Sequence, residues 1–214
     1  MKKIDRKIIS IKDINSIDKL KNLSKNELKI LTSMIRTDLI KMAKNNKIHL
    51  GSNLGIVELS AALLMEVDHN TRKIFYDTGH QCYVHKMLTG RYDKINSIRQ
   101  EGGLSGFPSK LESEFDFLSS GHSSTSLSIA QGFNETNDDV KCIPIIGDAA
   151  LNNGLALEAL NDIAFRKNKM IIVVNDNGES ISKTIGHLYN KMSKIKNRKW
   201  FFFIEKSIRH LFNK

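Results

Sequence analysis

The sequence predicts an α/β protein in which a parallel sheet has helices on both faces. Two apolar, β-rich runs, residues 141–146 and 170–174, flank a stretch at 155–164 whose apolar residues recur at helical spacing. Strand, helix and strand within about 40 residues form a βαβ unit, and such a unit requires the two strands to be parallel. A third short run, residues 73–76, predicts a further strand.

Length and charge exclude several classes of protein. The 214 residues include 40% hydrophobic residues but only 13 Gly and 2 Pro, so the chain is globular and neither collagen-like nor disordered. The net charge of +10 belongs to the ends: residues 1–50 carry 13 basic against 5 acidic residues, and 191–214 carry 8 against 1. Because the middle is mildly acidic, no basic groove runs along the body, and we expect no nucleic-acid partner.

The first half begins with a lead-in at residues 1–22. Ser24 and Glu27 have the spacing of a capping box, which predicts a helix start, and an apolar stripe then continues to about Asn45. A turn-rich stretch at 49–55 precedes a second apolar helix at 56–67. No apolar run has the length of a signal peptide or a membrane span.

The middle of the chain is less regular. The strand at 73–76 ends in Asp77-Thr78-Gly79-His80, and such a turn after a strand is a frequent ligand position in α/β sheets. Glycines and Pro108 break any period in residues 100–120, which predicts an ordered loop, either over a site or simply connecting. Small hydroxyl residues at 123–126 then open a short helix whose N-terminus could meet an anion.

Oxygen-bearing side chains follow the two strands of the βαβ unit. Asp148 comes after the first strand and Asn177 after the second, so both lie at one sheet edge. Carboxylate and amide oxygens suit Mg²⁺, which often keeps only one or two protein ligands beside substrate phosphates. The competing interpretation is that Asp148 is a helix N-cap and that Asn177 belongs to a turn.

Histidines and cysteines complete the candidate groups. His49, His80 and His122 each stand in a glycine-containing turn, where an imidazole can relay protons or hydrogen-bond a phosphate. The two cysteines, Cys82 and Cys142, are too few for a disulfide framework or zinc cage. We therefore expect free thiols and a cytoplasmic, reducing location.

Longer motifs give the chain a family resemblance. Gly147-Asp148, followed after a helix by Asn175-Asp176-Asn177, resembles a thiamine diphosphate signature. Other segments resemble 1-deoxy-D-xylulose-5-phosphate synthase, and the match runs in order from about residue 10 to about residue 195. They are His49-x-Gly-Ser-Asn-Leu-Gly, Asp77-x-Gly-His-Gln-x-Tyr-x-His-Lys86, Leu88-Thr-Gly-Arg91, Gly102-Gly-Leu-Ser-Gly-Phe-Pro108, Ser113-Glu-x-Asp116 and Gly121-His-Ser-Ser-Thr-Ser126.

The resemblance implies a role for each matching residue. Residues 23–190 would form the domain that binds thiamine diphosphate and Mg²⁺, and residues 191–214 a basic-aromatic helix or tail. Asp148 and Asn177 would hold the Mg²⁺, and His49 would handle protons near the substrate. The cofactor would be bound by Asn177, by the backbone of Ala149 and Ala150, by His80, and by the turn formed by Gly121, His122 and Ser123.

The family joins pyruvate to glyceraldehyde 3-phosphate with loss of CO₂, a first step towards isoprenoids that also feeds thiamine biosynthesis. Its members are about three times as long as this chain, and their second domain supplies the glutamate that activates the cofactor. We therefore expect this chain to be a subunit or a truncated form that needs a pyrimidine-binding partner. We expect it to pair with a separate pyrimidine-binding subunit, to form a homodimer, or both. The basic-aromatic tail could instead lie on a membrane, which we consider the weaker interpretation.

Four departures from the family pattern concern the cofactor site. Ala149 replaces a glycine, Asn152-Asn153 replace a threonine and a small residue, Glu179 replaces a methionine, and Lys47-Ile48 replace two glycines. A methyl group at 149 and a negative charge at 179 would both lie near the expected diphosphate. They motivate an alternative function, a non-catalytic remnant or binding module that keeps the fold without productive cofactor binding.

Overall fold

A parallel three-stranded sheet forms the centre of the computed structural model, which describes residues 10–14, 16–45, 48–176 and 194. The strands are β1 (Arg72–Tyr76), β2 (Lys141–Gly147) and β3 (Val173–Asn175), in the order β1-β2-β3. Arg72 pairs with Lys141, and Gly147 pairs with Asn175. The predicted α/β class, with parallel strands, is confirmed.

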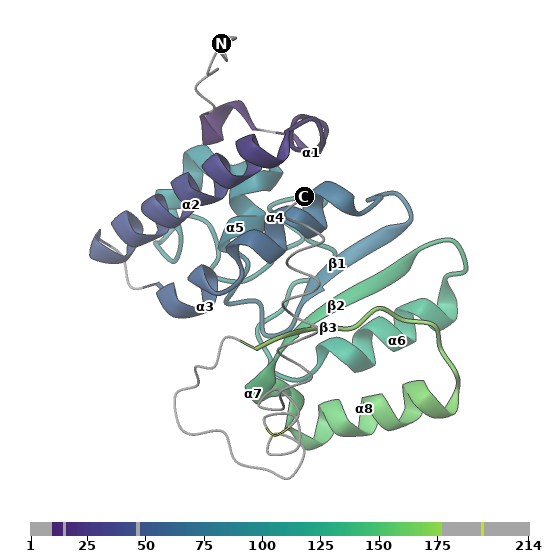
Figure 1. The fold of residues 1–214 in the computed structure, drawn as a ribbon. Coiled ribbons are helices and arrows are strands. Elements are labelled where there is room, and N and C mark those ends of the chain that lie inside the picture. Colours follow the sequence, from purple (N-terminus) through teal and green to yellow (C-terminus); the bar gives the residue numbers. More distant parts are fainter. Residues whose placement is uncertain (1–9, 15, 46–47, 177–193, 195–214) are drawn as a thin grey trace.

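Helices cover both faces of this sheet, and Figure 1 shows α6 and α8 on one side with the earlier helices on the other. The helices before β2 are η1 (Ile11–Asp13), α1 (Ile17–Lys21), α2 (Lys25–Asn45), α3 (Leu50–Leu54), α4 (Val57–Glu66), α5 (Tyr83–Lys86), η2 (Met87–Arg91), η3 (Tyr92–Ser97) and α6 (Ser126–Thr136). Those after β2 are α7 (Asp148–Leu151) and α8 (Gly154–Phe165).

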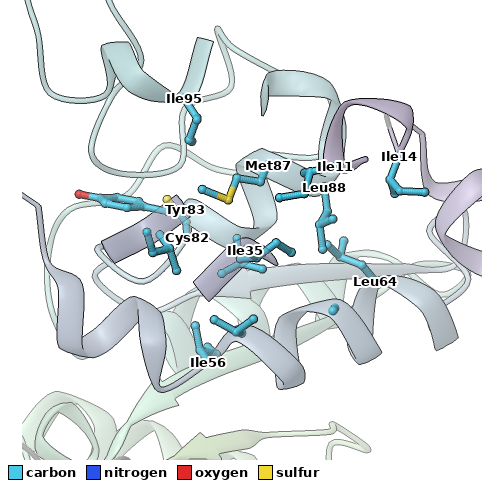
Figure 2. Packing of buried hydrophobic residues seen from close by; sticks show 14 of the residues in the cluster. Ile11, Ile14, Ile35, Ile56, Leu64, Cys82, Tyr83, Met87, Leu88 and Ile95 are labelled. Carbon is cyan, nitrogen blue, oxygen red and sulfur yellow. The ribbon is translucent and has the colours of Figure 1, made fainter. Parts of the chain in front are cut away.

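Two apolar clusters hold these layers together, because neighbouring residues of a strand point to opposite faces. Ile145 belongs to the larger cluster under α1–α5, whereas Ile146 belongs to the smaller one under α6 and α8. Figure 2 shows part of the larger cluster, where Ile35 and Leu64 meet Met87 and Leu88. Every one of these side chains is fully buried.

The predicted start of the long helix is confirmed. The Ser24 backbone N–H donates to Glu27 Oε2 at 2.8 Å, and the Glu27 N–H donates to Ser24 Oγ at 3.3 Å, so two backbone donors at the helix end are satisfied. The helices predicted around residues 127–133 and 155–164 are confirmed as α6 and α8.

The structure corrects two predicted elements. The stretch at 49–55, predicted as turns, contains the helix α3, because the backbone N–H of Gly55 reaches the carbonyl of Gly51. The last strand is only three residues long, because β3 pairs only with residues 145–147 at the end of β2.

The structure describes most of the N-terminal lead-in but only one residue of the C-terminal tail. Within the lead-in, Ile11 and Leu20 are buried against α2, α4 and η2, so this segment contributes to the core. The predicted tail lies outside the described residues, apart from Lys194. Among the helices that the structure describes, none is long and apolar enough to cross a membrane.

Candidate functional site

The three strands end at one edge of the sheet, and most of the predicted site residues follow them there. β1 leads into Asp77, β2 into Asp148 and β3 into Asp176. The pairing of Gly147 with Asn175 places the residues after these two strands at the same end of the sheet. Asn177 lies outside the described residues, so its joint role with Asp148 stays a prediction.

Asp77 shapes this edge because its buried carboxylate caps helix α6. Its Oδ1 accepts from the backbone N–H of Ser124 at 2.8 Å, and its Oδ2 accepts from that of Ser126 at 3.1 Å. The helix has no side-chain cap of its own, so Asp77 satisfies donors that would otherwise be unpaired. The cap fixes the preceding turn, in which Gly121, His122 and Ser123 are exposed at the sheet edge.

Ser124 connects that turn to the segment after β2. Its hydroxyl donates to the Ala150 carbonyl at 2.8 Å and accepts from Asn153 Nδ2 at 2.6 Å. Asn152 Nδ2 donates in turn to the Asp148 carbonyl at 2.9 Å. The two asparagines that depart from the family pattern thus make local hydrogen bonds, and these bonds hold the backbone around Asp148.

Asp148, Ala149 and Ala150 lie in the first turn after β2, in the short helix α7. The Asp148 side chain is 6% exposed, whereas Ala149 is exposed at the edge. Within the described part of the chain, no three His, Cys, Asp or Glu side chains gather as a metal cage. A cation bound at Asp148 would therefore need ligands other than a cluster of His, Cys, Asp or Glu side chains from the described residues.

A histidine pair forms the other half of the edge. The rings of His49 and His80 pack edge to face, with their centroids 5.3 Å apart, and His80 Nε2 lies 3.1 Å from Ser52 Oγ. Fully buried Asn53 holds both backbones, since its Nδ2 donates to the His49 and His80 carbonyls at 2.8 Å each. Its Oδ1 accepts from the Tyr83 N–H at 3.0 Å.

The surroundings of both histidines favour the neutral imidazole. Burial lowers the pKa of His49, and the nearby charge of Arg99 lowers it further. Burial also lowers the pKa of His80, helped by His49 and opposed by the Asp77 carboxylate. His80 Nδ1 is buried and has no hydrogen-bond partner among the described residues, so the bonding capacity of one ring nitrogen is unused.

The structure therefore brings the predicted residues to one sheet edge in two linked groups. His49 and His80 come from α3 and the turn after β1, and residues 121–123 and 148–150 join through Ser124. The turn at residues 77–80 connects the groups. Sequence reasoning missed the residues that organise them, Asp77, Asn53 and Ser124, although each carries a short polar side chain in a motif that the sequence already indicated.

The fold and this edge define a class of protein. A parallel sheet with polar turns at the carboxyl ends of its strands is an α/β domain of the kind that binds its ligand there. The chain belongs to the 1-deoxy-D-xylulose-5-phosphate synthase family, because the model of the N-terminal part of that family matches residues 11–214.

Individual relatives agree with this assignment. The chain is 50% identical to the 1-deoxy-D-xylulose-5-phosphate synthase of Malacoplasma penetrans over 205 residues, which are 95% of this chain and 34% of the relative. It is 46% identical to that of Clostridium perfringens strain SM101 over 190 residues, 87% of this chain and 31% of the relative. The chain thus spans about a third of the length of these relatives.

Proposed function

We propose that this chain is the diphosphate-binding part of a 1-deoxy-D-xylulose-5-phosphate synthase. The observation that supports this most strongly is 50% identity over 95% of the chain, including the turns that meet at the sheet edge. In this proposal the whole enzyme joins pyruvate to glyceraldehyde 3-phosphate and releases CO₂. The groups that activate the cofactor pyrimidine and hold the substrate phosphate then come from outside these 214 residues, in the same polypeptide or in a partner subunit.

The residues at the edge fit thiamine diphosphate and Mg²⁺. Asp148 and Asn177 offer the hard oxygen ligands that Mg²⁺ prefers, and the diphosphate would complete the shell. The unpartnered Nδ1 of His80 is a buried polar atom that a ligand can satisfy. No described atom lies within 4 Å of where a Cβ on Gly121 would be, so this part of the structure leaves room for a bound group at the turn.

When bound, thiamine diphosphate supplies the carbanion chemistry of the reaction. The protein's own residues then position and transfer protons. His49, exposed at the edge near the charge of Arg99, can accept or donate a proton at its imidazole near the substrate. His80 would line the cofactor, and its ring is oriented by Ser52.

The alternative is a non-catalytic domain that keeps the fold but binds no cofactor productively. The extensive identity to named synthases favours the synthase proposal over this alternative. The hydrogen bonds of Asn152 and Asn153 within the chain weaken one of its arguments, because these residues support the backbone of the site. Ala149 and Glu179 remain its basis.

Calorimetric titration with thiamine diphosphate, with and without Mg²⁺, tests the proposal. We expect metal-dependent binding that Asp148→Ala abolishes and that Asp139→Ala, which removes an exposed carboxylate away from the sheet edge, leaves unchanged. Ala149→Gly should strengthen binding if the methyl group crowds the diphosphate. Absence of binding at millimolar cofactor, both alone and with the remaining two thirds of a relative's synthase added in trans, would support the non-catalytic alternative.

A further inference from the structure

Residues 105–120, which we call the strap, are anchored by two carboxylates in a cluster of buried charges. Asp116 is 3% exposed and receives two bonds from Arg91, to Oδ2 at 2.6 Å and to Oδ1 at 2.8 Å. His85 Nε2 lies 3.1 Å from Oδ1, and the backbone N–H of Ser109 donates to Oδ2 at 2.8 Å. One carboxylate therefore joins helix α5, helix η2 and the strap.

Glu112 makes the second anchor. Its Oε2 pairs with Nζ of fully buried Lys86 and lies 3.5 Å from Arg91, while its Oε1 accepts from the Ser105 N–H at 2.7 Å. Two cations thus face two carboxylates inside the protein. Buried charges are costly unless each finds its partner, so the cluster tolerates very few arrangements of the strap.

The opposite side of the strap contacts the turn that carries His80. Ser120 Oγ donates to the Thr78 carbonyl at 3.3 Å, and the Ser120 N–H donates to the Pro108 carbonyl at 3.3 Å. Pro108 packs so closely on Gly79 that a Cβ at Gly79 would overlap it.

The turn itself needs an external support. Thr78 and Gly79 both have left-handed backbone, with φ of 56° and 93°. For Thr78 this conformation is strained and persists only where surrounding structure imposes it. In the described structure, Pro108 and Ser120 of the strap are in position to impose it.

We propose that Glu112 and Asp116 are positioning residues: they fix the strap on α5 and η2, and the strap holds the Thr78–Gly79 turn and, with it, the position of His80. Within the described residues, the side-chain bonds of both carboxylates go to α5, to η2 and to the backbone of Ser105 and Ser109. Their effect passes through Pro108 and Ser120, which are the parts of the strap that meet the turn. The assignment of His80 to the cofactor rests on the proposed function, whereas the mechanical link does not.

Amide hydrogen exchange in the full chain without cofactor tests this link. We expect Glu112→Gln to accelerate exchange at Gly79 and His80 by about tenfold, because local opening of the turn becomes easier, while Ile143 and Ile145 in β2 keep their rates. The imidazole NMR resonances of His80 should shift with it. Glu114→Gln is the matched control, since Glu114 is an exposed carboxylate of the same strap.

Ser120→Ala supplies a second variant that leaves the charge cluster intact and removes only the bond to Thr78. It should reproduce the faster exchange at Gly79 and His80, which keeps the test decisive if Glu112→Gln fails to fold. Equal acceleration in β2 and the turn, or no change in folded Glu112→Gln and Ser120→Ala chains, would overturn the proposal. Failure of the unmodified chain to bind thiamine diphosphate, both alone and with the remaining two thirds of a relative's synthase added in trans, would contradict the proposed function and leave the exchange result standing.

Discussion

Asp77 shows how one buried carboxylate can determine the geometry of a site without being a candidate for its chemistry. It is 2% exposed, and both of its oxygens accept backbone N–H groups at the start of α6. A carboxylate at this position also interacts favourably with the helix dipole. The exposed turn at 121–123 is consequently held by a residue 44 or more positions earlier in the sequence.

We predict that Asp77→Ala destabilises the chain by about 2–4 kcal/mol, because two buried N–H groups lose charge-assisted bonds. Urea unfolding monitored by circular dichroism measures the change. Asp139→Ala, at an exposed position, is the control and should change the free energy of unfolding by less than about 0.5 kcal/mol. A similar small loss in Asp77→Ala would contradict the capping role.

Asn53 has a comparable role on the histidine side. We predict that Asn53→Ala lowers stability by about 2–4 kcal/mol, since three backbone groups, the His49 and His80 carbonyls and the Tyr83 N–H, lose their bonds to this buried side chain. The His49 and His80 imidazole resonances should move in the same variant, because their backbones are no longer joined. Unchanged resonances in a folded Asn53→Ala chain would show that the α3 turn is fixed by other contacts.

These two residues also mark the limit of sequence reasoning at this scale. A strand end, a glycine turn and a histidine are visible in the sequence, and the positions of His80 and Asp148 at the sheet edge followed from them. Apart from His49 and Thr78, the partners of the Asp77 and Asn53 side chains lie 27 to 49 residues away, and no local pattern encodes such pairings.

At the scale of elements, the turn after β1 depends on a glycine. Gly79 has φ of 93°, and a Cβ there would overlap Pro108 and the Ser120 hydroxyl. We predict that Gly79→Ala costs more than about 2 kcal/mol, because strain and overlap add. The thermal midpoint of unfolding measures this cost.

Gly132→Ala provides the comparison, because Gly132 lies inside α6 and no atom of the described residues is within 4 Å of the added Cβ. Alanine in an open helical position should raise stability by roughly 0.5–1 kcal/mol. If the two glycine variants behave alike, the close contact between the strap and the turn does not exist in solution.

Periodicity and capping identified the elements whose residues interact locally. The capping box of α2 and the stripes of α6 and α8 were sufficient to predict those helices. The helix α3 was not predicted, because its five residues include a glycine and two short polar residues, which favour turns. The short length of β3 was also not predicted, because that length depends on how many residues of β2 pair with β3.

For the whole molecule, buried titratable groups predict a loss of stability in acid. Burial lowers the pKa of His85, although Asp116 opposes the shift, so the unfolded chain with its ordinary pKa of 6.5 binds this proton more readily. The free energy of unfolding therefore carries no penalty from His85 above pH 6.5, and it falls as the pH drops below that value. We expect His85→Gln to flatten this decline, as measured by urea unfolding between about pH 5 and 8.

A second decline should follow at lower pH. Burial alone would raise the pKa of Asp116, but hydrogen bonds from His85 and Arg91 outweigh it and hold that pKa well below 3.8. Its contribution is present above pH 3.8 and is lost as the pH falls further. His122→Gln changes an exposed histidine and should leave both declines unaltered.

The arrangement of the strands has one consequence for how the chain is made. The partner of Arg72 in the sheet is Lys141, and during synthesis at about 5–20 residues per second roughly 3–14 s separate the two. For that interval Ile74, Phe75 and Tyr76, all buried in the finished sheet, have no strand to pair with. The nascent chain therefore exposes an apolar strand edge that a chaperone can bind before β2 emerges.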